Sequence, residues 1–451
     1  MKYPTISEYV KASQDVSDNL DMSTEATNAE LNEVITDEFG VKYRKDGRKL
    51  LKAPYELNGT YSIKEGVRII CDEAFYYCSS LRSLVIPDSV TSIGAGAFGG
   101  CRSLTDIAIP DSVTSIGERA FRGCESLESL VLPESVGNII GNPFSGWDGE
   151  LKCLSPYFIY DNKVLFDKDK SKIIAFRDKN TTSYVIPDGV TGIGNYAFAD
   201  CRSLTDIVIP DSVTSIGDEA FWGCWSLSSI VIPNGVTSIG DETFGYCSSL
   251  TNIAIPDSVT SIGERAFRGC ESLESIVIPD SVTSIDNSAF WCCKSLSSIV
   301  IPNGVTRIGD GAFDYCESLS NLVIPDSVTS IGKSAFRGCT SLTDIVIPDC
   351  VTSIEDGAFC CCESLTDIVI PNSVTSIGDE AFVDCHSLTD IVIPDCVTSI
   401  GRDAFYGCKS LSSIVIPDSV TSIGYCVFYE CNFPNDLKQE LISRFGEKIF
   451  G

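Results

Sequence analysis

The chain has 451 residues, a formal net charge of −29, 43% hydrophobic residues and a single histidine, His386. So acidic a chain is a poor match for nucleic acid, because phosphate binding requires a basic surface, and for an anionic membrane. One histidine excludes an HExxH or two-histidine zinc site and argues against a histidine-paired nucleophile. The hydrophobic fraction indicates a large core, so the charge must lie on the surface.

The first segment, residues 1–40, carries nine acidic side chains against two lysines, and we expect an acidic leader that is partly helical or mobile. It contains no apolar run of signal-peptide length, and no apolar stretch of the chain is long enough to cross a membrane. The sequence therefore predicts a cytoplasmic protein without a transmembrane segment. In that compartment the 22 cysteines would be reduced thiols.

A repeat of 23 residues occupies most of the remaining chain, and LTDIVIPDSVTSIGDEAFWGCWS, residues 204–226, represents it. LxxIxI has the alternation of a short strand, the proline ends its ladder, and VTSI and AFxxC supply further inward side chains. One such unit cannot bury these residues alone. Counting the recurring phenylalanine, about fifteen turns must stack into an α/β-type repeat solenoid.

The pattern LxxIxIPxxVxxIgxxAFxxC resembles the leucine-rich repeat of the BspA-like, or Treponema pallidum-type, family over residues 41–431. The resemblance implies a leucine-rich-repeat curved rod with a parallel β-sheet on its concave face. It also implies a non-catalytic binding or adhesion role, in many members at the bacterial or protist cell surface. A cell-surface or secreted location is therefore the alternative to the cytoplasm.

Two related modules divide the array. Pro133 and Pro187 are 54 residues apart, more than twice the period, and residues 164–198 in this region align without a gap to residues 41–75. Each copy is predicted to form two strands around a KDG or KDK turn. The predicted parts are the acidic leader (1–40), an N-terminal hairpin or capping module (41–75), a first sub-array (76–145), an inserted hairpin module acting as an internal joint (146–186), a second sub-array (187–431) and a C-terminal capping helix (432–451).

Most cysteines occupy one repeat position, three residues after the phenylalanine. Free cysteine is readily buried, and parallel side chains about 5 Å apart exceed the ~3.8 Å Cβ separation that a disulfide prefers. We interpret this cysteine column as buried, reduced thiols. Cys360 and Cys361 precede its member Cys362 and are interpreted as drifted positions, so labelling should find one of the pair reactive and Cys362 protected. The fourteen members are Cys78, Cys101, Cys124, Cys201, Cys224, Cys247, Cys270, Cys293, Cys316, Cys339, Cys362, Cys385, Cys408 and Cys431.

The candidate binding residues lie on three successive LTDIVIP strands. In a leucine-rich repeat, strand residues between the buried ones face the concave side, which here becomes an acidic patch. Carboxylates about 5 Å apart could recruit Ca²⁺ or a basic partner, although aspartate after proline is also a common turn residue on a solvated face. The candidates are Asp344, Asp367, Asp390, Asp349, Asn372, Asp395, Val346, Val369 and Val392.

The predicted function is non-catalytic binding of a protein or other macromolecule. Because the concave face is predicted to be acidic, a basic partner is favoured. We expect a monomer without cofactor or metal. A scaffold or variable surface antigen without one specific site is the alternative. An enzyme would require a pocket built by the inserted module, since acids repeated along an open sheet have no means of separating their pKa values. A role for the aromatic residues Trp222, Trp225, Trp291, Tyr246 and Tyr315 stays open, because duplication also explains their positions.

Overall fold

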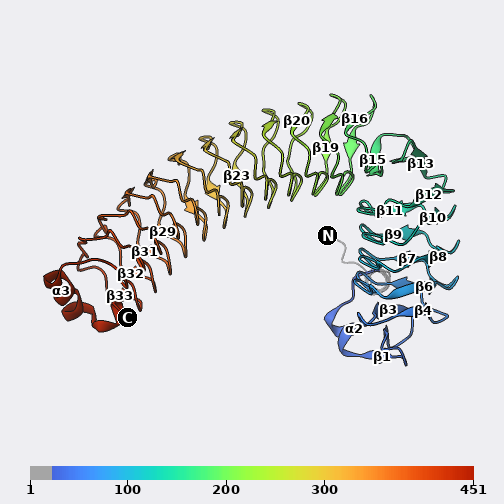
Figure 1. Ribbon diagram of the computed structural model, residues 1–451, viewed down its shortest axis with the longest axis horizontal. Coiled ribbons are helices and arrows are strands. Elements are labelled where there is room, and N and C mark those ends of the chain that lie inside the picture. Colours follow the sequence, from blue (N-terminus) through green and yellow to red (C-terminus); the bar gives the residue numbers. More distant parts are fainter. Residues whose placement is uncertain (1–22) are drawn as a thin grey trace, which may run out of the picture. The chain divides into compact units, whose positions relative to one another are not determined.

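The computed structural model describes residues 23–451 and contains a parallel-sheet solenoid, as predicted (Figure 1). Residues 1–22, which hold most of the predicted leader, lie outside the described part. The chain divides into two compact units, Met1–Asp178 with Gly194–Phe198, and Lys179–Ile193 with Ala199–Gly451. This boundary falls inside the predicted inserted module, where a hairpin interrupts the regular stack.

Each turn contributes to two ladders. The long-strand ladder contains the LxxIxI strands, and the short-strand ladder contains the two-residue SI strands that follow the proline. In the first unit the long strands are β4 (Gly59–Ser62), β6 (Leu81–Val85), β8 (Asp106–Ile107), β10 (Ser129–Leu132) and β12 (Glu150–Cys153), and the short ones are β5 (Ile69–Ile70), β7 (Ser92–Ile93), β9 (Ser115–Ile116) and β11 (Asn138–Ile139).

The second unit repeats this arrangement. Its long strands are β16 (Ser183–Val185), β18 (Asp206–Val208), β20 (Ser229–Val231), β21 (Asn252–Ala254), β22 (Ser275–Val277), β24 (Ser298–Val300), β26 (Asn321–Val323), β28 (Asp344–Val346) and β30 (Asp367–Val369). Its short strands are β17 (Gly192–Ile193), β19 (Ser215–Ile216), β23 (Ser284–Ile285), β25 (Arg307–Ile308), β27 (Ser330–Ile331), β29 (Ser353–Ile354), β31 (Ser376–Ile377), β32 (Ser399–Ile400) and β33 (Ser422–Ile423). Neighbouring turns pair in parallel with a register shift of 23 residues, as in Ser275 opposite Ser298.

The core is a column of phenylalanine rings. From Phe221 to Phe428, consecutive ring centroids are 5.2–5.8 Å apart and the ring planes are within 14° of parallel. The AFxxC corner also joins turns through its backbone, since the N–H of Phe290 donates to the carbonyl of Ala312 one turn later. Stacking therefore supplies both the apolar burial and the hydrogen bonds that a single turn lacks.

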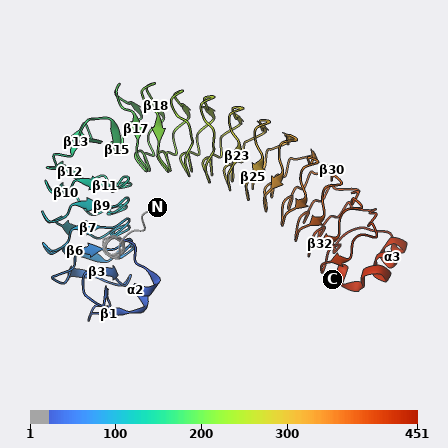
Figure 2. The same cartoon turned by 180° about the vertical axis from the view of Figure 1, so that it is seen from behind.

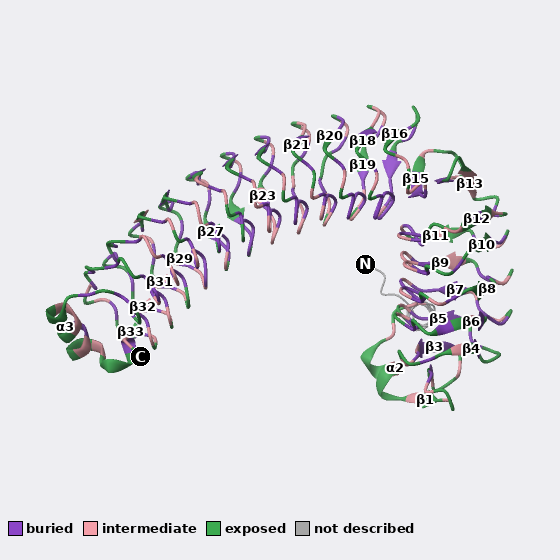
Figure 3. Ribbon diagram, viewed as in Figure 1, coloured by how far each residue is buried: buried purple, intermediate pink, exposed green. Residues whose placement is uncertain are grey.

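The two ladders of the second unit lie on opposite sides of its bend. Figure 2 shows β30 on the outer side and β32 on the inner side, and in Figure 3 exposed residues gather along the outer side. Turns lie close together at the glycine after the short strand, because a Cβ on Gly401 would lie 2.4 Å from the backbone nitrogen of Asp379. The long-strand ladder is correspondingly interrupted between β18 and β20, β21 and β22, and β26 and β28. The prediction that the LxxIxI strands face the concave side was therefore wrong, since the concave side carries the short strands.

The N-terminal end is closed by a hairpin with a helix beside it. Strands β2 (Lys42–Arg44) and β3 (Lys49–Lys52) are antiparallel, and β3 pairs in parallel with β5. The end of the predicted leader adds α2 (Asn28–Asn32) and β1 (Val34–Thr36), which pairs with β2.

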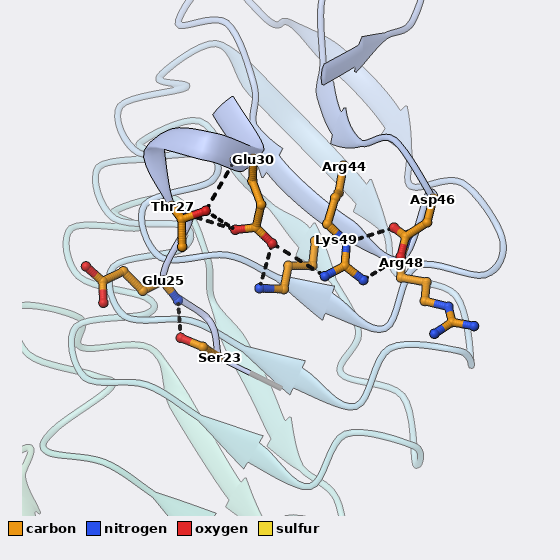
Figure 4. A network of polar contacts seen from close by, with 8 residues as sticks. All are labelled: Ser23, Glu25, Thr27, Glu30, Arg44, Asp46, Arg48 and Lys49. Carbon is orange, nitrogen blue, oxygen red and sulfur yellow. Dashed lines mark hydrogen bonds and ion pairs between the residues drawn. The ribbon is translucent and has the colours of Figure 1, made fainter. Parts of the chain in front are cut away.

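A polar network holds α2 against this hairpin (Figure 4). The Thr27 hydroxyl and the Glu30 carboxylate cap α2 reciprocally, and Glu30 Oε1 lies 3.0 Å from Nζ of the buried Lys49 and 3.4 Å from Arg44. Helix α2 is too short to be stable alone, so this network and its tertiary contacts must hold it in place.

The second hairpin contains β14 (Val164–Asp167) and β15 (Lys172–Phe176), with β13 (Phe158–Asp161) antiparallel to β14. Like β2 and β3, β14 and β15 are interrupted by a register shift, and the two shifts fall at positions that align between the modules. The side chain of Arg177 after β15 is buried, stacks on Trp147 at 4.1 Å and donates to the carbonyl of Gly149.

The C-terminal helix α3 (Asn435–Phe445) and the 3₁₀ turn η1 (Glu447–Ile449) follow the last repeat. The N–H of Phe428 donates to Ile449, and the Phe450 ring lies 6.1 Å from that of Phe428. Residues after α3 thus occupy the place of a further turn. Arg444 on α3 donates to the carbonyls of Ile416 and Pro417.

Candidate functional site

The nine predicted binding residues are all exposed, and they lie on the long-strand ladder of the second unit. Asp344 pairs with Asp367, and Val346 with Val369, in the parallel register of β28 and β30. The structure therefore brings two of the three predicted turns side by side. Asp390 and Val392 occupy the next turn outside a named strand, where Val392 forms an isolated bridge to Val415.

Alternation along the strand positions these side chains. In β28 the side chain of Ile345 is buried, while those of Asp344 and Val346 point outward on either side of it. The proline that follows cannot donate to the ladder and ends the strand, which leaves Asp349, Asn372 and Asp395 in exposed turns. The Thr343 hydroxyl donates to the Asp344 carboxylate at 3.0 Å, which orients this acid on the same strand as Val346.

The three predicted valines belong to a longer row, which we call the valine stripe. Its members are 50–79% exposed, although valine is usually buried. Alanine replaces valine at one turn, at Ala254. The sequence already indicates this row, because a valine stands between the two isoleucines of nearly every LxxIVIP strand. The candidate binding residues include only three of these valines. The valine stripe contains Val185, Val208, Val231, Val277, Val300, Val323, Val346, Val369, Val392 and Val415.

Comparison with known families explains the repeat. The model of the BspA type leucine rich repeat region matches in six copies at residues 58–154, 172–297, 283–395 and 375–451. The chain belongs to the BspA-type leucine-rich repeat family. A leucine-rich repeat protein from Bacteroides ovatus is 30% identical and covers 93% of this chain and 97% of its own, with a TM-score of 0.46.

Two further solved structures of leucine-rich repeat proteins are similar. A leucine-rich repeat protein from Eubacterium ventriosum is 26% identical, with a TM-score of 0.53, and the match covers 62% of this chain and 82% of that one. A leucine rich cell surface protein from Faecalibacterium prausnitzii is 29% identical, with a TM-score of 0.43, over 84% of this chain and 94% of that one. No curated protein sequence matches significantly. Within residues 23–451, no helix is long and apolar enough to cross a membrane.

Other polar columns of this BspA-type repeat stabilise the stack. The serine after Pro-Asp donates to a valine carbonyl of the preceding turn, as Ser212 does to Val190 at 2.7 Å. The aspartate after Ile-Gly accepts an N–H of the following turn, as Asp379 does from Arg402 at 2.7 Å. These side chains have backbone partners one turn away, so their recurrence does not indicate a ligand.

The cysteine column has a similar partner. Its members are at most 4% exposed, and a typical thiol, that of Cys270, donates to the carbonyl of Phe244 at 3.2 Å. Burial raises the pKa of Cys124 to about 12 and that of Cys270 well above the ordinary thiol value. Cys350 and Cys396 replace the stacking serine and are exposed.

The predicted aromatic outliers stack between turns. The rings of Trp222 and Tyr246 are 5.7 Å apart, edge to face, and those of Trp291 and Tyr315 are 6.5 Å apart. Arg268 lies 4.6 Å over the Trp291 ring. These contacts join neighbouring corners, on a different part of each turn from the valine stripe.

The described residues offer little for metal or acid–base chemistry. In residues 23–451, no three histidine, cysteine, aspartate or glutamate side chains converge to hold a metal ion. A recess of the first unit is lined by acids and arginines, among them Asp72, Glu118 and Arg122. It is lined by residues 25–26, the end of the N-terminal module and the first sub-array, whereas the enzyme hypothesis required a pocket on the inserted module.

Proposed function

We propose that the protein binds a macromolecular partner, without catalysis, through the valine stripe and its flanking polar columns. The observation that carries this proposal is the exposure of ten valines in one row, 50–79% each. Isolated exposed apolar residues are ordinary on protein surfaces, whereas contiguous ones are typical of interaction sites. Membership of a repeat family that is typically non-catalytic supports the same reading.

The residues on either side of the valine stripe indicate which chemical groups a partner should carry. Two residues before each valine stands aspartate, asparagine or serine, and the residue after the proline is aspartate or asparagine. Asp344, Asp367 and Asp390 give three successive turns with an acid before the valine, and Asp349 and Asp395 add an acid after the proline in the first and third of them. We infer a protein partner with an elongated apolar ridge and lysine or arginine beside it.

A displayed peptide library panned against the folded chain tests this proposal. Val300, Val323 and Val346 changed together to threonine keep the branched shape suited to a strand but remove the apolar row. We expect selected peptides to lose at least about tenfold in affinity, which corresponds to ~1.4 kcal/mol. Changing Asp344, Asp367 and Asp390 to asparagine should weaken binding mainly at low salt, because screening already suppresses exposed charge pairs at high salt.

A matched control lies on the opposite ladder of the same turns. Thr306, Thr329 and Thr352 are exposed there, and serine in their place keeps a hydroxyl like that of Thr329, which donates to the carbonyl of Thr306 at 3.1 Å. This control variant should bind as the parent does. Equal binding by the valine variant and the parent would overturn the proposal and favour the alternative of a scaffold or surface antigen without one specific site.

A further inference from the structure

The corner of one turn places two adjacent thiols in contact. Sγ of Cys360 lies 3.4 Å from Sγ of Cys361, and the two groups share a hydrogen bond. Cys360 is 7% exposed, whereas Cys361 is half-buried and reaches the surface. The sulfur of Cys362 points elsewhere and donates to the carbonyl of Phe336 at 3.2 Å.

The same chain contains a second adjacent pair, at the equivalent corner 69 residues earlier. There Trp291 occupies the place of Cys360, and Cys292 and Cys293 correspond to Cys361 and Cys362. The sulfur of Cys293 donates to the carbonyl of Phe267 at 3.2 Å, as expected for the cysteine column. The thiol–thiol contact therefore depends on the combination of Cys360 and Cys361, and adjacency alone does not explain it.

We propose that Cys360 and Cys361 form a redox-active dithiol, which closes to a disulfide between adjacent residues by exchange with a small-molecule disulfide. The inference is independent of the proposed binding function. The pair lies at the AFxxC corner, whereas the valine stripe lies on the long strands.

Accessibility fixes the order of the steps. The thiolate of Cys361 attacks one sulfur of the small disulfide, whose S–S bond breaks and releases one thiolate that takes a proton from water. Cys360 then loses its proton to water and attacks Sγ of Cys361, and the second small thiolate leaves. Two protein thiols are oxidised and one small disulfide is reduced to two thiols, so atoms and electrons balance.

The surroundings favour ionisation of the outer thiol. The hydrogen bond from Cys360 lowers the pKa of Cys361 to about 7, although burial and the carboxylates of Asp384 and Glu363 oppose this and Arg337 supports it. The pKa of Cys360 is raised by its hydrogen bond to Cys361 and by burial. Cys361 is therefore the attacking group and Cys360 the resolving one.

The backbone between the two cysteines connects three turns. The carbonyl of Cys360 accepts from the N–H of Gly338 at 2.8 Å, and the N–H of Cys361 donates to the carbonyl of Val383 at 2.7 Å. Both bonds belong to the one peptide group that the disulfide ring would contain. Cys361 also has φ 60°, a left-handed conformation that Gly338 adopts at the preceding corner with φ 68° and Asp384 at the following corner with φ 54°.

Closing the ring must strain this peptide. Adjacent Cα atoms are about 3.8 Å apart, which is below the 4.4–6.8 Å that disulfides usually span, so the bond should be readily reduced. Strain on the peptide would weaken both of its hydrogen bonds. Oxidation should therefore loosen the stack on either side of Cys360 and Cys361.

The test treats the folded chain with oxidised glutathione near neutral pH, then blocks free thiols with N-ethylmaleimide in denaturant. Cleavage after Glu355 and Glu363 releases residues 356–363, which contain all three cysteines. We expect this peptide to lack two hydrogen atoms and to carry one maleimide, on Cys362. A peptide with three maleimides, a lasting glutathione adduct on residues 356–363 of the parent chain, or a disulfide that includes Cys362 would overturn the proposal.

Variants assign the two roles. Cys360→Ser should trap the glutathione adduct on Cys361, whereas Cys361→Ser should leave Cys360 reduced; an adduct on Cys360 in the second variant would contradict the order of steps. The double change Cys360→Trp with Cys361→Gly reproduces the Trp222–Gly223 pair of another corner and controls for folding. Cys292 is an internal control that should gain an adduct but no ring.

Hydrogen exchange measures the structural effect. In the oxidised parent, the amides of Gly338 and Cys361 should exchange roughly fivefold to tenfold faster than in the reduced parent, because each loses much of one hydrogen bond. The amide of Cys292, which donates to Asp314 in the equivalent place, should be unchanged. Unchanged exchange at Gly338 and Cys361 in a fully oxidised sample would refute the loosening.

Discussion

At the scale of single residues, the repeat uses small polar side chains to satisfy the backbone of the neighbouring turn. Ser212 donates to the carbonyl of Val190, Asp379 accepts from the N–H of Arg402, and Cys270 donates to the carbonyl of Phe244. An unpaired buried backbone group costs free energy, so each such side chain stabilises the stack. These roles explain why the same polar residues recur every 23 residues.

Buried thiols make stability depend on alkaline pH. Burial raises the pKa of Cys224, Cys247 and Cys270 well above that in the unfolded chain, so their contribution is complete below the unfolded value, near 9, and is lost as pH rises toward the folded value. Each thiol that ionises only on unfolding lowers the free energy of unfolding by about 1.4 kcal/mol per pH unit in that window.

Replacing these three cysteines by alanine should therefore flatten the pH dependence between about pH 9.5 and 11 by roughly 4 kcal/mol per unit. Urea unfolding at several pH values measures this slope. The variant should be less stable than the parent at pH 7, because cavities form. An unchanged slope would show that the thiols are already ionised in the fold.

Residue chemistry was only partly visible in the sequence. The burial of the cysteine column could be predicted from its spacing behind the phenylalanine, and the structure places all fourteen members inside. The contact between Cys360 and Cys361 could not, because the direction of a side chain at a corner depends on φ, which is 60° at Cys361. From the sequence alone, both residues are interpreted as drifted positions.

At the scale of elements, the ends of the solenoid are closed by segments that replace a missing turn. Strand β3 presents its backbone to β5, and η1 presents Ile449 to Phe428. Hairpins and a terminal helix could be predicted from turn residues and composition. The addition of β1 and the docking of α2 could not, because a three-residue strand and a five-residue helix carry too weak a local signal.

The ion pair between Glu30 and Lys49 should stabilise the N-terminal cap, since Lys49 is 1% exposed. Glu30→Gln removes the carboxylate from a buried ammonium group, and we expect a loss of about 3–5 kcal/mol in the stability of the cap. Glu30→Gln with Lys49→Met should recover much of this loss, because both charges are then absent. Hydrogen exchange in β1 to β3 reports the local stability.

The control for this comparison is Asp46→Asn, which breaks the more exposed ion pair of Asp46 with Arg44. Its cost should stay below about 1 kcal/mol, as for other surface pairs. If the double variant were no more stable than Glu30→Gln, the ion pair would not be the source of the effect.

At the scale of the whole molecule, both units combine an apolar core with a strongly acidic sequence. The net charge is −29, with 62 acidic residues against 33 basic ones. Repulsion among like charges on a folded surface destabilises it, and added salt screens this repulsion.

Raising NaCl from about 0.01 M to 0.3 M should therefore increase the thermal midpoint by a few °C, in contrast to a protein held together by surface ion pairs. Thermal unfolding followed by circular dichroism at fixed pH measures this shift. Guanidinium chloride is unsuitable because it changes salt and denaturant together. A midpoint that falls with NaCl would indicate that attractive surface pairs outweigh the repulsion.

The sequence by itself determined the repeat, its stacking into a parallel-sheet solenoid and the family, because a 23-residue unit with several apolar side chains can be stable only beside copies of itself. It also placed Val346, Val369 and Val392 between inward-facing neighbours, since alternation depends on local geometry alone, and all three side chains are exposed. Only the tertiary structure decided which ladder lies inside the bend and which sulfur atoms meet. The bend of the second unit is a property of many stacked turns, and no single turn contains that information.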